Sequence, residues 1–243
     1  MGRMLTYLYW IIAAIEVFGE ATDNDTIRFC SKPLLMIVLI ALYSQSIIGP
    51  TNAFHRLMVS AFFFSWIGDV ALMFVPRFAG DVTLMGFPKD PNFFLVGLVG
   101  FLIAHLLYVG AFSKVTLKHA ESLLPKKWWL LSPLVVYMGV LLYLLVPAIN
   151  AQPETQPFLA PVIVYSAVIA TMVVFAINRY GRVNDQSFAL VFGGALLFML
   201  SDSIIAINKF VMPFESARIF IMVLYITAQY LIARGALKQE QAV

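Results

Sequence analysis

Cysteine and charged residues are both scarce in this chain. Cys30 is the single cysteine among 243 residues, which excludes an internal disulfide and a cysteine-based zinc knuckle. Charged residues make up only 12% of the chain against 61% hydrophobic residues, and the mean hydropathy is +0.88. A soluble domain carries more polar surface than this. The composition therefore predicts an integral membrane protein.

Two further absences narrow the function. No Gly-x-Ser-x-Gly sequence occurs, so the nucleophile turn of serine hydrolases is missing. The 16 Lys and Arg residues are scattered singly at the ends of apolar runs rather than clustered, although the formal net charge is +3. A nucleic-acid-binding surface needs a basic patch. We therefore expect neither a serine nucleophile nor a nucleic-acid partner.

Eight apolar runs of membrane-spanning length follow one another along the chain. A helix that crosses the hydrocarbon core needs roughly 20 mostly apolar residues, and turn-forming or charged residues separate the runs. The predicted fold is all-α, a single membrane domain over residues 1–243. Its eight helices are expected at about 5–20, 33–49, 56–76, 93–113, 128–147, 158–178, 187–209 and 215–237.

Lys and Arg in the connections predict the orientation, because they are enriched on the cytoplasmic side of membrane proteins. Eight spans place both termini on one side. Ten basic residues fall on that side and six on the other: Arg3, Arg56, Lys114, Lys118, Lys126, Lys127, Arg179, Arg182, Arg234 and Lys238 against Arg28, Lys32, Arg77, Lys89, Lys209 and Arg218. We therefore predict cytoplasmic termini, in a bacterial inner membrane or an endoplasmic reticulum membrane.

Three carboxylates lie inside the predicted spans. An ionisable side chain within a span costs at least a few kcal/mol, so each one is a functional hypothesis. Glu16, Asp69 and Asp202 all lie past the midpoint of an outward-running span, within roughly 10 Å of its outer end at about 1.5 Å per residue. Although they come from separate helices, they share one depth. We therefore expect them to meet in the outer half of the bundle.

Other polar side chains are expected near these carboxylates. His105 lies near the middle of span 93–113, one turn before Tyr108. Lys32 is predicted to begin a span and Lys209 to end one, on the same stripe as Asp202. Candidate lining residues on other spans follow the same spacing: Ser65, Tyr165, Ser166, Ser201, Arg218, Met222, Tyr225 and Gln229.

Each of these residues also has a structural interpretation. Lys209 could form an ion pair with Asp202, and both Lys209 and Lys32 are typical of side chains that reach from a helix end towards the headgroups. Glu16 could face water, and His105 could be a hydrogen-bonded core residue. For Asp69 and Asp202 we favour function.

A catalytic zinc site would need an unusual set of ligands. Such a site usually takes three protein ligands, often histidines, and the three histidines here are His55, His105 and His119. His55 and His119 are predicted at cytoplasmic helix or loop ends, far from His105. Zinc would therefore need His105 together with Asp69 and Asp202 or Glu16, and we expect no metal.

Five short motifs occur in order over nearly the whole chain. They are Ser31–Leu34, Gly68–Leu72, Phe94–Gly97 leading to Ala104–Tyr108, Gly194–Asp202 continuing through Ala206–Phe210, and Tyr225–Gln229. In these motifs and their order the chain resembles the YhhN-like lysoplasmalogenase family. None of the motifs is specific alone, whereas five in order over eight spans form a strong resemblance. The loop Gly80–Pro91 is longer than we would expect of that family.

The resemblance implies hydrolysis of the sn-1 vinyl ether of a lysoplasmalogen, which yields a fatty aldehyde and glycerophosphoethanolamine or glycerophosphocholine. Protonation of the β-carbon creates an oxocarbenium ion, water captures it, and the hemiacetal collapses. Two neighbouring carboxyls in a site of low polarity can divide the acid and base roles, because one can hold a proton while the other stays ionised. Asp69 and Asp202 are the predicted catalytic pair.

The remaining polar residues would support this chemistry. His105, Tyr108, Glu16, Tyr165, Ser201 and Tyr225 are candidates for a proton relay or for lining the site. Lys32, Lys209 or Arg218 could receive the substrate phosphate near the headgroup layer. No cofactor is expected, and the expected partners are a lysophospholipid substrate and the membrane lipid.

A proton-coupled transporter or a lipid-binding membrane protein is the alternative, since buried Asp, Glu and His residues also build proton relays. A transporter should show repeat-related broken helices and a polar lining that reaches both faces. The carboxylates here are predicted to crowd one half of the membrane. A metal-independent lipid hydrolase therefore fits the sequence better.

Overall fold

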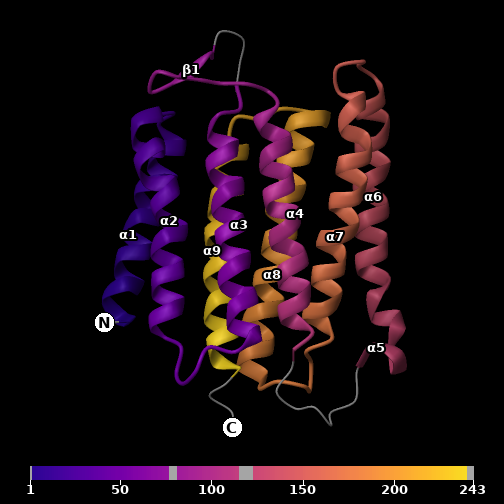
Figure 1. Cartoon of the computed structure of the whole chain (residues 1–243). Helices are drawn as coiled ribbons and strands as arrows, with labels where there is room; N and C mark the ends of the chain where they lie inside the picture. The colour runs from indigo at the N-terminus through magenta and orange to yellow at the C-terminus, as the bar shows by residue number, and fades with distance from the viewer. Residues whose placement is uncertain (1, 77–80, 115–122, 240–243) are drawn as a thin grey trace. The chain divides into compact units, whose positions relative to one another are not determined.

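The computed structural model describes residues 2–76, 81–114 and 123–239 (Figure 1). Within these ranges eight helices are long and apolar enough to cross a membrane, which confirms the all-α, multi-pass prediction. The chain divides into two compact units, residues 1–111 and 112–243, and each is described by itself. Four residues named in the sequence predictions lie outside the described ranges: Arg77, Gly80, Lys118 and His119.

Unit 1 holds four spanning helices and one short hairpin. The helices are α1 (Gly2–Ala21), α2 (Asp25–Gln45), α3 (Ala53–Met73) and α4 (Phe93–Phe112), and the last residue of α4 already belongs to unit 2. The strands β1 (Thr83–Leu84) and β2 (Phe87–Pro88) pair in antiparallel fashion between α3 and α4. Figure 1 shows α1 and α2 running side by side.

Unit 2 holds the other four spans, several of them extended by a short turn of another helix type. Its elements are α5 (Leu123–Lys126), the 3₁₀ helix η1 (Trp128–Leu131), α6 (Ser132–Asn150), the 3₁₀ helix η2 (Gln156–Phe158), α7 (Leu159–Ile177), α8 (Asp185–Ala206), the π-helix η3 (Ile207–Val211) and α9 (Ala217–Lys238). The π-helix continues α8 directly.

Asparagine caps three of the spanning helices at their first turn. Asn24, Asn52 and Asn184 precede α2, α3 and α8, and the side-chain oxygen of each accepts a hydrogen bond from the backbone N–H three residues later, at 2.8–3.1 Å. A capping side chain replaces one of the hydrogen bonds that the first turn of a helix lacks. These asparagines define where the spans begin.

Helix α2 begins earlier than the sequence predicts. Its first residue is Asp25 rather than residue 33, so only residues 22–24 connect α1 to α2. Pro33 lies inside the helix, and the polar stretch from Arg28 to Lys32 forms its first turns rather than a loop. The prediction was wrong because the low hydropathy of charged residues indicates a loop between two spans. The charged residues of this stretch are instead buried against carboxylates of α1.

The connection between α3 and α4 contains a hairpin that was not predicted. Met85 and Gly86 form its two-residue turn, and both have positive φ angles, of 51° and 86°. Positive φ at both central positions is the type I′ geometry that matches the twist of paired strands. The backbone N–H of Asp90 donates to the carbonyl oxygen of Phe74 at 2.9 Å, which ties the hairpin to the end of α3.

Glycines let helix backbones touch inside each unit. A Cβ atom on Gly100 of α4 would lie 3.0 Å from the backbone nitrogen of Gly68 on α3, and one on Gly194 of α8 would lie 2.8 Å from the carbonyl oxygen of Ala228 on α9. Small residues permit such close contacts between membrane helices. Two pieces of the motif pattern, at Gly68 and at Gly194, are therefore packing positions, and Gly68 directly precedes Asp69.

Candidate functional site

Three consecutive polar residues of α8, Ser201–Ser203, bind three different helices of unit 2. The Ser201 hydroxyl donates to the carbonyl oxygen of Ile221 on α9 at 3.0 Å. On the other side of α8, Tyr137 of α6 donates its hydroxyl to Ser203 Oγ at 2.8 Å. Consecutive residues of an α-helix point about 100° apart, at 3.6 residues per turn, so one short segment can serve three neighbours.

Asp202, the middle residue of this segment, binds α7. The hydroxyl of Tyr165 donates a hydrogen bond to Asp202 Oδ2. Tyr165 is 9% exposed and Asp202 is partly buried. The structure thus brings together two of the predicted site residues, with the hydroxyl as the donor and the carboxyl oxygen as the acceptor.

The predicted polar face of α9 is buried within unit 2, except at its start. Gln229 Nε2 donates to the Tyr225 hydroxyl at 3.3 Å, and the Tyr225 ring packs edge-on against Phe198 of α8 with centroids 5.4 Å apart. Both Tyr225 and Gln229 are buried, whereas Arg218 in the first turn is only partly so. Tyr225 therefore lies against α8, one turn from the Ser201–Ser203 segment at Phe198.

Lys209 lies in the π-helix rather than in a regular span. The prediction that Asp202 and Lys209 share one helix face assumed an α-helix that continues to Lys209. The α-helix ends at Ala206 instead. A π-helix closes i→i+5 hydrogen bonds and often occurs at functional sites. The exposed Lys209 amine lies 5.5 Å and 5.7 Å from the ring centroids of Phe158 and Phe210, in cation–π contact.

In unit 1, Glu16 of α1 is completely buried against α2. The Ser31 hydroxyl donates to Glu16 Oε2 at 2.6 Å and also approaches the carbonyl oxygen of Ile27 at 2.7 Å. The exposed fraction of Glu16 is 0%, so the interpretation that it faces water is wrong. Its other oxygen, Oε1, has no hydrogen-bond partner in the described part of the chain.

One turn further along α1, Glu20 pairs with two cations of α2. Arg28 Nε lies 3.0 Å from Glu20 Oε1, and Lys32 Nζ lies 3.9 Å from the same oxygen. Arg28 also binds Asp25 at 3.0 Å. Lys32 is 9% exposed and lies well inside α2, so it neither begins the span nor reaches out to the headgroups as predicted.

Asp69, His105 and Tyr108 are all buried in unit 1. Asp69 is 3% exposed, and His105 and Tyr108 are 0% exposed. Ser65, one turn before Asp69 on α3, is also buried, and its hydroxyl oxygen has no hydrogen-bond partner among the described residues. Asp69 belongs to unit 1 and Asp202 to unit 2, so their convergence stays a prediction.

The described residues contain no group of three His, Cys, Asp or Glu side chains arranged to hold a metal ion. His55, which the sequence assigned to a cytoplasmic helix end, is buried near the start of α3. Its Nδ1 atom lies 2.7 Å from the Tyr43 hydroxyl, a hydrogen bond that links α2 to α3. His55 therefore packs in the core.

The model of the YhhN family matches residues 27–236 of this chain. The chain belongs to the YhhN family. Human lysoplasmalogenase TMEM86A is 29% identical to it over 165 residues, which cover 68% of this chain and 63% of that protein. Lysoplasmalogenase TMEM86B of Sus scrofa is 34% identical over 154 residues, which cover 63% of this chain and 57% of that protein. No solved structure is significantly similar to the chain.

The residues that the family model matches include one polar cluster of this YhhN protein completely and another only in part. The matched range contains all of the Ser201–Ser203 segment and its partners, and it contains Asp69. Glu16 and Glu20 precede it, although the α2 residues that bind them lie within it. The chain spans 63% and 57% of the lengths of the two relatives named above.

Sequence reasoning missed four polar residues of these clusters. Two of them, Glu20 and Arg28, are in unit 1, and the sequence held a signal for them. Glu20 lies four residues after Glu16 on α1, and Arg28 lies four residues before Lys32 on α2. Residues at i and i+4 share a helix face, so two such pairs on adjacent antiparallel helices predict contact. Tyr137 and Ser203 in unit 2 had no comparable signal, since each is a single polar residue in an apolar run.

Removing the Arg28 charge should destabilise unit 1 strongly. We expect Arg28→Met to leave Glu20 as a poorly compensated buried charge and to cost about 3–5 kcal/mol of unfolding free energy. Thermal unfolding of the purified protein in detergent measures this loss. Arg56→Met, at an exposed position in the first turn of α3, is the matched control. The double variant Glu20→Gln with Arg28→Met should recover part of the stability, and a single variant as stable as the control would contradict the assignment.

Proposed function

We propose that this YhhN-family protein hydrolyses the sn-1 vinyl ether bond of lysoplasmalogens within the membrane. The observation that carries the proposal is the partly buried carboxylate of Asp202, held by the Tyr165 hydroxyl, in a multi-pass chain whose similar proteins are named lysoplasmalogenases. The products are a fatty aldehyde and glycerophosphoethanolamine or glycerophosphocholine. Asp69 on α3 is the second carboxyl of the proposed mechanism.

The hydrogen bond from Tyr165 favours one division of roles between the two aspartates. The Tyr165 hydroxyl donates to Asp202 Oδ2, so the carboxylate of Asp202 is held in place as an acceptor. We therefore assign Asp202 the ionised role, in which it stabilises the oxocarbenium ion and accepts a proton from the attacking water. Asp69, which is nearly completely buried on α3, takes the other role in this proposal, that of the acid.

The reaction then proceeds in three steps. The Asp69 carboxyl transfers its proton to the β-carbon of the vinyl ether, which leaves a cation shared by the α-carbon and the ether oxygen. Water attacks the α-carbon while Asp202 takes one of its protons, and a hemiacetal forms. The C–O bond to the glycerol oxygen then breaks as Asp202 returns its proton to that oxygen and the hemiacetal hydroxyl gives its proton to Asp69, so the aldehyde forms and both carboxyls regain their starting states. Each positioned acid or base contributes roughly 10²–10⁴-fold to such a rate.

We assign the substrate phosphate to Lys209 and Arg218 rather than to Lys32. Lys209 is exposed in the π-helix η3 and Arg218 is partly exposed at the start of α9, only a short connection away. Lys32 instead lies 3.9 Å from Glu20. Cations near the headgroup layer attract phosphate. Glu16, His105, Tyr108, Ser201 and Tyr225 remain our candidates for lining the site or relaying protons.

Asparagine at either aspartate should abolish the activity. We expect Asp69→Asn and Asp202→Asn to lower kcat/KM for a choline or ethanolamine lysoplasmalogen by about 10²–10⁴-fold, because asparagine can serve as neither acid nor base. The measurement is aldehyde release by the detergent-purified protein. Asp185→Asn, at an exposed position in the first turn of α8, should stay close to wild type.

The same assay separates the alternatives. Chelator should leave aldehyde release unchanged, and loss of activity with chelator alone would point to a metal site instead. If well-folded wild type released no aldehyde and also left an ester analogue intact, a transport or lipid-binding role would replace the hydrolase.

Tyr165→Phe should lower kcat more than it raises KM. The substitution removes only the hydroxyl that donates to Asp202, and a hydrogen bond to a charged group is worth about 1.5–3 kcal/mol, or roughly 10- to 150-fold in rate. Steady-state kinetics of aldehyde release measures the division between kcat and KM. Tyr143→Phe, at a position of α6 that is 78% exposed, is the control. Equal kinetics for the two variants would show that Tyr165 does not act through Asp202.

We also propose that both termini are cytoplasmic, as the distribution of Lys and Arg favours. In a Cys30→Ala background, a membrane-impermeant thiol reagent added to intact cells or sealed vesicles should label Gln152→Cys from the non-cytoplasmic side. Thr51→Cys should react only after the membrane is permeabilised. Both positions are exposed. The reverse pattern would invert the orientation.

A further inference from the structure

The hairpin between α3 and α4 hides its charged side chains and exposes its apolar ones. Asp81 and Lys89 are only 8% and 9% exposed, whereas Val82, Met85 and Phe87 are 66%, 54% and 58% exposed. Asp and Lys are rarely buried, and a loop that faces water normally displays them. A group of exposed apolar side chains is typical of a surface that contacts another apolar surface. The hairpin therefore suits surroundings less polar than water.

Ion pairs explain how the charged residues of the hairpin are buried. Lys89 Nζ lies 2.6 Å from Asp81 Oδ1 and 3.7 Å from Asp25 Oδ2 at the start of α2. Arg28 binds the other oxygen of Asp25 at 3.0 Å. Removing a charge from water is costly unless an opposite charge compensates it. Because Lys89 and Asp81 compensate each other, the hairpin brings no isolated charge into a less polar environment.

The hairpin lies at the level of the helix ends. At its base, the backbone N–H of Asp90 donates to the carbonyl oxygen of Phe74, just past the end of α3, at 2.9 Å. At its tip, the Thr26 hydroxyl in the first turn of α2 lies 3.9 Å from Met85 Sδ. The hairpin thus reaches across from α3 to α2, and Figure 1 shows it at the ends of these helices. The ends of spanning helices lie near the headgroup layer.

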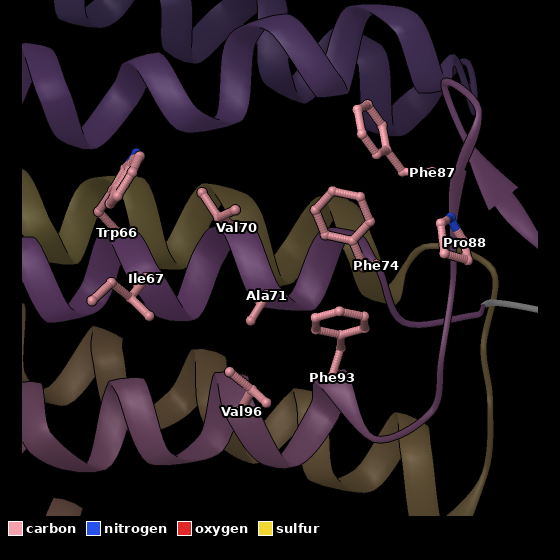
Figure 2. Close-up of a pocket in the computed structure, with 9 residues that line it drawn as sticks. All are labelled: Trp66, Ile67, Val70, Ala71, Phe74, Phe87, Pro88, Phe93 and Val96. Carbon is pink, nitrogen blue, oxygen red and sulfur yellow. The ribbon is translucent and has the colours of Figure 1, made fainter.

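Phe87 joins the hairpin to the outer surface of the spans. Phe87 and Pro88 line an apolar groove of about 420 Å³ together with side chains of α3 and α4. Figure 2 shows the rings of Phe74, Phe87 and Phe93 together at the hairpin end of this groove, and the Phe74 centroid lies 6.4 Å and 5.5 Å from the other two. Val96 of α4 lines the same groove and is 47% exposed. The apolar surface of the spans therefore continues onto the hairpin.

We propose that the hairpin is inserted in the membrane interface, with Val82, Met85 and Phe87 at the boundary between the headgroups and the acyl chains of one leaflet. Amphipathic segments at this boundary bury their apolar side about 5–10 Å deep. The occupant of the exposed apolar surface is then the phospholipid of the bilayer. The continuity through Phe87 favours lipid over a partner protein, because the exposed surface of the spans already faces lipid. This inference does not rest on the proposed hydrolase.

Fluorescence quenching measures the depth of the hairpin. In a Cys30→Ala background, an environment-sensitive dye is attached to Val82→Cys, and the protein is reconstituted in phosphatidylcholine nanodiscs. Gln152→Cys, exposed in a connection on the same side of the membrane, is the aqueous control. Val99→Cys, 51% exposed within α4, is the control for the hydrocarbon core. We expect iodide in the water to quench the hairpin dye about tenfold less than the Gln152 dye, because the interface shields it.

Brominated lipids complete the depth measurement. Bromine near the headgroup end of the acyl chains should quench the dye at Val82 more than bromine near the chain end, and the dye at Val99 should show the opposite order. Met85→Cys is a second hairpin site, in case the first variant does not fold. If the hairpin dye behaved like that at Gln152, with strong iodide quenching and no quenching by lipid, the proposal would be overturned and a partner protein would be the better occupant. Behaviour like that at Val99 would also overturn it.

Breaking the ion pair should lift the hairpin towards water. We expect Lys89→Met to raise iodide quenching of the dye at Val82 about threefold, because the charge of Asp81 loses its closest compensation. Lys127→Met, at an exposed position, is the matched control and should change nothing. The double variant Asp81→Asn with Lys89→Met should return the quenching to the original value, which general unfolding would not do. Equal quenching in Lys89→Met and Lys127→Met would contradict the role given to the ion pair.

Discussion

A bilayer core supplies no water to a buried polar group, so each carboxyl, hydroxyl and amine inside these helices needs a partner within the protein. Most of the observed polar contacts follow from this constraint. Ser201, Asp202 and Ser203 meet hydrogen-bonding groups of three different helices, and Glu20 is compensated by Arg28 and Lys32. The same contacts that satisfy the polar groups also fix how the helices pack, because each one joins two spans.

The clusters of the two units satisfy this constraint differently, and the difference bears on function. In unit 1 the carboxylate of Glu20 is neutralised by cations, which suits a structural role. In unit 2 Asp202 accepts a hydrogen bond from a phenol, which is compatible with the negatively charged role that the proposed mechanism gives it.

Much of the fold could be predicted because it follows from local properties of the chain. The eight spans follow from hydropathy, and the shared face of Tyr225 and Gln229 on α9 follows from helical spacing. The start of α2 could not be predicted this way, since hydropathy at Arg28 and Lys32 indicates a loop, and only the partner carboxylates on α1 make burial of these residues favourable. Tyr137 was missed for a related reason, because a lone tyrosine in an apolar helix does not reveal its partner.

The sequence by itself determined the class of protein, the number of spans and the set of residues that are costly in lipid, because each of these depends on composition and on distances along the chain. Only the tertiary structure decided which partner each polar residue has: Tyr165 for Asp202, Ser31 for Glu16, Glu20 for Lys32. The tertiary structure also decided that an apolar groove lies between α3, α4 and the hairpin. Pairings and grooves depend on how separate helices approach each other, which the periodicity of a single helix does not specify.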